Sequence, residues 1–152
     1  MRLLPLTVML CLAVSNNPFV GVWHSGPDPY RNGRSSPVLL TFSTDIESLT
    51  LRRESVTSTG ERRASTFRYF FDGKYHPLEY PADAKHKTHT VMYRRIDEST
   101  LEFTIDHDNG TLHTTTRHTV AADRRTMTEI WSGVDEKGQP IRLEIVLTKG
   151  QE

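Results

Sequence analysis

Three side chains in this sequence, Arg95, His118 and Glu129, are the best suited to charge or proton chemistry. A guanidinium, an imidazole and a carboxylate that share a buried space can form an ion pair, hold the polar end of a ligand, or exchange a proton. A carboxylate is costly to bury unless it is paired, so we expect Arg95 or His118 to neutralise Glu129. Whether the three meet depends on the strands that carry them and on how those strands pair.

Short turns predict the pairing. Asn109-Gly110 is the strongest signal of a two-residue hairpin turn, and further turns are expected at 97–99, 121–125 and 136–138. On the outer face they pair Glu102 with Arg117 and Asp106 with His113. On the inner face they predict these pairs: Tyr93 with Phe103, Arg95 with Leu101, Leu101 with His118, Phe103 with Thr116, His118 with Glu129, Thr116 with Trp131, Trp131 with Leu143, and Glu129 with Ile145. A four-residue turn after the strand at 89–96 would instead turn Met92 and Arg94 inward, and we do not favour it.

The predicted registers place Arg95, His118 and Glu129 in one inward row, together with Leu101 and Ile145. We favour a structural ion pair that closes one end of the fold. A polar anchor for a ligand and an acid–base pair are the two alternatives.

A second inward row forms the expected wall of a cavity. It combines aromatic and aliphatic side chains with a hydroxyl: Tyr93, Phe103, Thr116, Trp131 and Leu143. Small inner residues such as Thr114 favour a cavity over a fully packed interior. The two rows together supply the candidate ligand-binding residues, which are Tyr93, Arg95, Phe103, Thr116, His118, Glu129 and Trp131.

Seven histidines raise the question of a metal site. The preferred register pairs His89 with His107 at the rim, but two imidazoles without a third ligand are weak evidence for a metal. No nucleophile or phosphate-loop motif occurs in the sequence. We therefore expect neither a metal nor a cofactor.

The elements that position these side chains are short strands joined by short turns, without a helical period of useful length. Strands are expected at 20–23, 38–42, 49–57, 66–71, 89–96, 101–106, 111–120, 126–132 and 141–149. Pro77 and Pro81 make 75–87 an extended loop or edge segment. This pattern predicts an all-β, antiparallel up-and-down meander closed into a barrel of about eight to ten strands.

Bulk composition excludes several partners. The chain has 152 residues with 19 basic and 19 acidic side chains, so its net charge gives no general electrostatic attraction to nucleic acid or to an anionic membrane. The pairs Arg52-Arg53 and Arg62-Arg63 alternate with Glu54 and Glu61, which predicts a solvated outer face. No apolar run reaches the roughly 18 residues of a membrane span.

The N-terminus has the pattern of a secretory leader. Arg2 precedes an apolar run, and Ser15 is a small residue placed for cleavage. We expect a leader at 1–15, one domain at 16–152, and a secreted or periplasmic protein. Cleavage would remove Cys11, the single cysteine, and leave no disulfide. A lipoprotein site at Cys11 is not favoured by the residues before it.

Several segments together resemble a family of small bacterial secreted lipocalin-like (calycin-type) proteins. They are Gly21-Val22-Trp23 with the preceding Phe19, then 72–77, 91–100, 116–128 and 135–140. The resemblance spans about 19–149 and implies a small lipocalin-like β-barrel with an internal cavity, but no established reaction. In lipocalins an arginine commonly packs over this tryptophan, so the resemblance also implies a cation–π contact of Arg95 with the Trp23 indole. The chain departs from the family pattern at 24–30 and at His76.

Three functions follow as hypotheses. The first is a monomer that binds a small apolar or amphipathic ligand inside the barrel. The second is a non-metal enzyme of the isomerase or cyclase type that uses Glu129, His118 and Tyr93. The third is a protein-interaction module with an inert barrel, in which 25–36 or 75–87 makes the contacts.

Overall fold

The computed structural model describes residues 17–27, 37–45, 48–56, 60–78, 89–107, 112–134 and 137–150. Its elements are β1 (Gly21–Ser25), β2 (Val38–Thr44), β3 (Leu49–Val56), β4 (Arg62–Tyr69), β5 (Tyr75–Pro77), β6 (His89–Arg95), β7 (Thr100–His107), β8 (Leu112–Val120), β9 (Thr126–Val134) and β10 (Pro140–Lys149). Within these ranges no helix is long and apolar enough to cross a membrane. The leader at 1–15, most of the two predicted contact loops, the Asn109-Gly110 turn and His86 lie outside the described residues.

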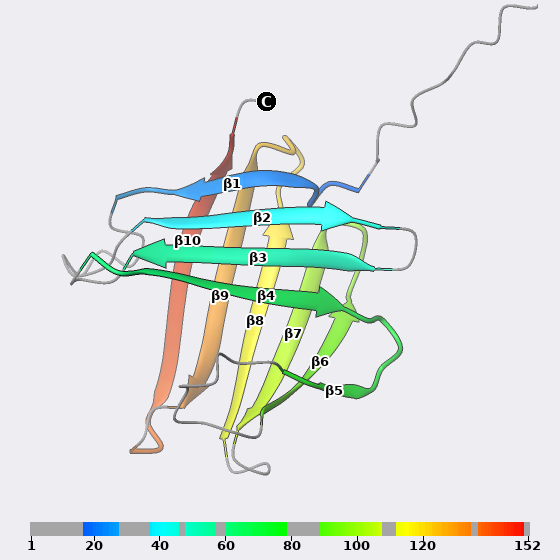
Figure 1. Cartoon of the computed structure of the whole chain (residues 1–152), viewed down its shortest axis with the longest axis vertical. Coiled ribbons are helices and arrows are strands. Elements are labelled where there is room, and N and C mark those ends of the chain that lie inside the picture. Colours follow the sequence, from blue (N-terminus) through cyan, green and yellow to red (C-terminus); the bar gives the residue numbers. More distant parts are fainter. Residues whose placement is uncertain are drawn as a thin grey trace, which may run out of the picture.

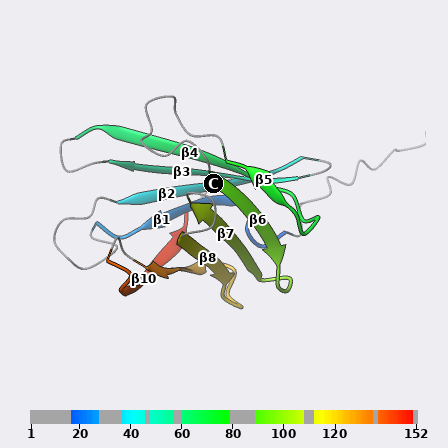
Figure 2. The same cartoon turned by 90° about the horizontal axis from the view of Figure 1, so that it is seen from below.

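All ten strands form one antiparallel sheet in the order β4-β3-β2-β1-β10-β9-β8-β7-β6-β5. The sheet curls so that β1–β4 run across β6–β10 (Figures 1 and 2), an arrangement in which the two inner faces enclose the core. The predicted all-β meander is confirmed. Its two edge strands, β4 and β5, follow each other in the chain. The predicted strand at 66–71 begins earlier, at Arg62, because its first half pairs with the end of β3.

Every predicted cross-strand pair occurs in the structure. His118 faces Glu129, Thr116 faces Trp131, and Leu101 faces both Arg95 and His118. The last hairpin pairs Trp131 with Leu143, and Gly138 adopts the expected left-handed conformation with φ 75°. The length of each tight turn fixes the register of its hairpin. Burial of one face reinforces this register, because a slip by one residue would turn every buried side chain outward.

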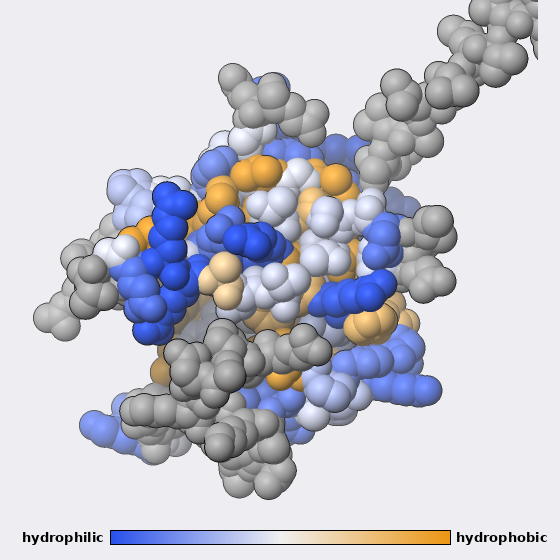
Figure 3. All heavy atoms as spheres, in the orientation of Figure 1, coloured by the Kyte–Doolittle hydropathy of each residue, from blue (hydrophilic) through white to orange (hydrophobic). Residues whose placement is uncertain are grey.

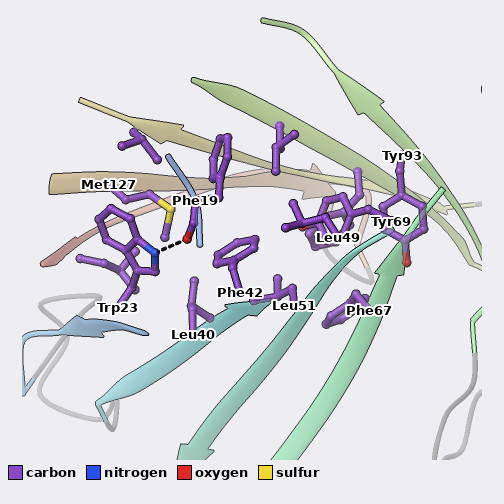
Figure 4. Close-up of a cluster of buried hydrophobic side chains, with 14 of the residues drawn as sticks. Phe19, Trp23, Leu40, Phe42, Leu49, Leu51, Phe67, Tyr69, Tyr93 and Met127 are labelled. Carbon is purple, nitrogen blue, oxygen red and sulfur yellow. Dashed lines mark hydrogen bonds between the residues drawn. The ribbon is translucent and has the colours of Figure 1, made fainter. Parts of the chain in front are cut away.

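The core is densely packed around Trp23 at one end (Figure 4). The indole is fully buried, and its Nε1 donates a hydrogen bond of 2.8 Å to the Phe19 carbonyl oxygen. Phe42 continues the cluster, with its ring 5.8 Å from that of Phe19 and 6.4 Å from that of Tyr69. The Tyr69 ring in turn lies 4.5 Å from the Tyr93 ring. Aromatic contacts therefore link β4, one edge strand, to β6, which is the neighbour of the other edge strand, β5.

The cation over Trp23 is Lys149, not Arg95. The Lys149 Nζ lies 5.2 Å from the indole, whereas the Arg95 guanidinium lies 5.1 Å from the Phe71 ring. The predicted register of Arg95 is right, but Arg95 is the last residue of β6 and reaches past the end of the core into solvent. Gly21, with φ 126°, lets Lys149 pass, since a Cβ there would come within 2.7 Å of the Lys149 Cε.

The outer faces are polar, as the strand alternation predicts. The front of the molecule, formed by β1–β4, carries hydrophilic side chains and side chains of intermediate hydropathy, with hydrophobic ones between them (Figure 3). On the opposite layer Glu102 lies between Arg94 and Arg117 and forms ion pairs with both. His113 Nδ1 lies 2.7 Å from the Asp106 carboxylate, as expected from the register.

Candidate functional site

A cavity of about 340 Å³ opens between the two layers of the sheet. Its walls come from β3, β4, β7, β8, β9 and β10 and consist of Leu51, Arg53, Phe67, Phe103, Ile105, Thr116, Glu129, Trp131 and Leu143. Trp131 and Leu143 are only half-buried, so this part of the wall is accessible from solvent. The volume lies near the lower end of the range of about 300–1,000 Å³ that is typical of small-molecule sites.

A polar group of three side chains is built against this cavity. Arg53 Nη1 donates to both carboxylate oxygens of Glu129 at 2.6 Å. His118 Nε2 lies 2.9 Å from Glu129 Oε2. Glu129 and His118 are buried, with side-chain exposures of 4% and 0%, and Arg53 is 26% exposed. The three side chains come from β9, β8 and β3, so both layers of the sheet contribute.

Glu129 is held in its ionised form. Burial by itself raises the pKa of this carboxyl group, but the Arg53 charge and the His118 hydrogen bond outweigh burial and lower the pKa to about 2. A carboxylate of such low basicity is a poor general base at neutral pH. Its chemistry is that of a hydrogen-bond acceptor.

His118 is the fully buried member of the group. Because Glu129 is ionised, the His118 Nε2 carries the proton and donates it to Oε2. The other ring nitrogen, Nδ1, is buried without a hydrogen-bond partner among the described residues. The ring lies between Phe42 and Phe103, at centroid distances of 5.5 and 6.0 Å.

Tyr69 places a further polar atom in the same interior. Its hydroxyl is buried and has no hydrogen-bond partner among the described residues. Burial raises the pKa of this hydroxyl well above its ordinary value, and the neighbouring Tyr93 and Glu129 raise it further. Tyr69 therefore stays protonated throughout the physiological range.

Replacing Tyr69 with Phe should stabilise the protein. The substitution keeps the ring contacts and removes a buried hydroxyl that costs about 1–3 kcal/mol when it lacks a partner. We expect the free energy of unfolding to rise by about 1 kcal/mol in urea titrations at pH 7. The matched control is Tyr93→Phe, because the Tyr93 hydroxyl is not among the buried polar atoms that lack a hydrogen-bond partner. A clear loss of stability in Tyr69→Phe would show that the hydroxyl has a partner.

The structure separates the predicted site residues into three groups. Phe103, Thr116, Glu129 and Trp131 line the cavity. Tyr93 and His118 are buried beside it but are not part of its wall. Arg95 lies outside, at the end of β6.

Arg53 is the charged cavity residue that the sequence analysis missed, and the apolar Leu51 and Phe67 of the facing layer were missed with it. We had placed Arg52-Arg53 on a solvated outer face, and this is wrong for Arg53. The signal was present in the alternation, because Leu49, Leu51 and Arg53 share one face of β3 and the two leucines are buried. We assigned Arg53 to the outer face because its side chain is charged, although its position in the alternation predicts an inward side chain.

The predicted histidine pair is present. The rings of His89 and His107 are 4.4 Å apart, and His107 Nε2 lies 2.9 Å from the Thr114 hydroxyl. Over the described ranges, no three His, Cys, Asp or Glu side chains come together in a way that could hold a metal ion.

Comparisons with known proteins bear on the fold. No family model matches the chain, and no curated protein matches it. Among solved structures it is similar to a Schistosoma mansoni fatty acid binding protein in complex with arachidonic acid, with a TM-score of 0.62 and 17% sequence identity. The match covers 88% of this chain and 97% of the other. At this identity the likeness shows a shared calycin-type β-barrel fold.

Proposed function

We propose that this protein binds a small apolar or amphipathic molecule in the cavity between the two layers of its sheet. The observation that carries the proposal is the cavity itself, which is lined mainly by apolar side chains and has one compact polar group in its wall. Sites of this composition suit a ligand with an apolar body and a single polar end. The likeness to a fatty acid binding protein supports the same conclusion.

The lining is sufficient for useful affinity. Each methylene group transferred from water into an apolar site contributes about 0.8 kcal/mol. About ten such groups contribute about 8 kcal/mol, which corresponds to a dissociation constant near 1 µM before the costs of immobilisation. Because immobilisation weakens binding, we expect dissociation constants above about 1 µM for ligands whose chains fill the cavity.

The chain's two tryptophans provide an internal test. Trp131 lines the cavity, whereas Trp23 is fully buried in the packed end of the core. Titration with isoprenoid and long-chain ligands should change the emission of Trp131 as the ligand covers its exposed face. The change should persist in Trp23→Phe and disappear in Trp131→Phe, with binding in both variants checked by native mass spectrometry.

Two outcomes would contradict the proposal. One is the absence of any bound ligand by native mass spectrometry across the panel. The other is a fluorescence change that survives in Trp131→Phe but is lost in Trp23→Phe, since this would place the ligand at the other end of the barrel.

We further propose that the chain is made with a secretory leader at 1–15 and acts as a secreted or periplasmic monomer of the small bacterial lipocalin-like type. Arg2, the apolar run after it and Ser15 support the leader. Intact mass spectrometry of exported protein should find a chain that starts at Asn16. Retention of Met1 in that chain would contradict the proposal.

A further inference from the structure

We infer that the cavity selects an uncharged ligand with a hydroxyl group over a ligand with a carboxylate. The inference deepens the proposed function and rests on it. It concerns the polar end of the ligand, whereas the proposed function concerns the apolar body.

Charge in the cavity wall is already balanced. Among the described residues that line it, Arg53 and Glu129 are the ionised ones, and they form a direct ion pair at 2.6 Å. His118 lies behind this pair, fully buried, and its Nε2 is 2.9 Å from Glu129 Oε2. The guanidinium and the carboxylate of this pair balance each other, so the Arg53 charge is already offset before an anionic ligand enters.

A ligand carboxylate would meet a carboxylate of the protein. To reach the Arg53 guanidinium it would have to approach within a few ångströms of Glu129, which is 4% exposed and cannot turn into bulk water. Two carboxylates at that separation repel strongly, and the pair would leave a net negative charge in a largely apolar cavity. An ionised head group is therefore disfavoured.

A ligand hydroxyl fits the same group. From the described residues, Glu129 Oε1 accepts one hydrogen bond, donated by Arg53, whereas Oε2 accepts from both Arg53 and His118. A carboxylate oxygen can accept two hydrogen bonds, so Oε1 can take one more from an O–H donor. The Thr116 hydroxyl lies in the same wall and can either donate or accept. A primary alcohol on an apolar chain satisfies this arrangement without adding charge.

The Schistosoma mansoni fatty acid binding protein with a similar fold is in complex with arachidonic acid, a carboxylic acid. In this chain the guanidinium in the cavity wall already holds a carboxylate of the protein. The two barrels share a fold, and we expect them to differ in the polar end that they accept.

The test compares three ligands with one carbon skeleton. Farnesol, farnesoic acid and farnesene should be titrated into the wild-type protein at pH 7, where the acid is ionised. We expect farnesol to bind at least about tenfold more tightly than farnesoic acid, with farnesene between them or near farnesol. An acid that binds as tightly as the alcohol would overturn the inference. If none of the three binds, the proposed function fails with it, whereas tight binding of the acid leaves the proposed function intact.

A variant should reverse the preference. Glu129→Gln removes the competing carboxylate and leaves the Arg53 charge beside the cavity, so farnesoic acid should gain at least about tenfold in affinity. The control is Glu102→Gln, the same substitution at a buried carboxylate of the outer face, which should leave the order of the ligands unchanged. The wild-type comparison does not require that Glu129→Gln folds. A folded Glu129→Gln protein that still prefers the alcohol would contradict the role assigned to Glu129.

Discussion

Replacing Glu129 with Gln is expected to lower the free energy of unfolding by about 3 kcal/mol at pH 7 and to have little effect near pH 2. In the folded protein the pKa of this carboxyl group is lowered from 4.5 to about 2, since Arg53 and His118 outweigh the effect of burial. A tenfold change in an acid constant corresponds to about 1.4 kcal/mol, which gives about 3 kcal/mol for this difference. Gln keeps the shape of the side chain but cannot carry the charge.

The direction of the pH dependence follows from the lowered pKa. The stability that Glu129 contributes is fully present above its unfolded-state pKa of 4.5 and is lost as the pH falls towards its folded-state pKa of about 2. Urea unfolding of wild type and Glu129→Gln at a series of pH values between 7 and 2 should show the two curves converging. Other carboxylates with lowered pKa values, such as Glu102 and Asp123, contribute equally to both proteins and cancel in the difference. A difference that stays constant with pH would show that the ion pair does not hold Glu129 ionised.

Replacing Trp23 with Ala is expected to cost about 3–5 kcal/mol, the range observed for large aromatic deletions in packed cores. Trp23 is fully buried and is tied to the Phe19 carbonyl by a hydrogen bond of 2.8 Å. Its loss would open a cavity at the end of the barrel and would also release the segment before β1. Urea unfolding at pH 7 measures the effect, and loss of near-ultraviolet circular dichroism would report loosening of the core.

Trp131→Ala is the matched control for this prediction. Trp131 is only half-buried and already lines a cavity, so truncation removes fewer contacts and should cost less than about 2 kcal/mol. The same substitution should weaken binding of apolar ligands, whereas Trp23→Ala should not do so directly. Equal losses of stability at both positions would contradict the division of the barrel into a packed end and a binding end.

The hairpins of the second half were predictable because their information is local. Turn residues and strict alternation determine which side chains face each other across a pair of adjacent strands. His118 and Glu129 could therefore be placed together from sequence alone, and they lie 2.9 Å apart. The inward positions of Phe103, Thr116 and Trp131 follow for the same reason.

Arg53 and Arg95 show where this reasoning ends. Both lie on inward-facing positions of their strands, yet Arg53 reaches Glu129 and Arg95 lies against Phe71. Arg53 and Glu129 are separated by 76 residues and belong to opposite layers of the sheet. Their contact depends on how the sheet curls and where β3 crosses β9, which no turn between neighbouring strands specifies.

Alternation, turn chemistry and composition by themselves determined the all-β meander, the strand registers and the inward His118–Glu129 pair. Tertiary structure alone decided which cation completes the pair, which end of the barrel is packed around Trp23, and where the cavity opens. The physical reason is that strand pairing is set by backbone hydrogen bonds between near neighbours. The partners of a buried charge are set by the distance between layers, and this exists only once the sheet has closed over its core.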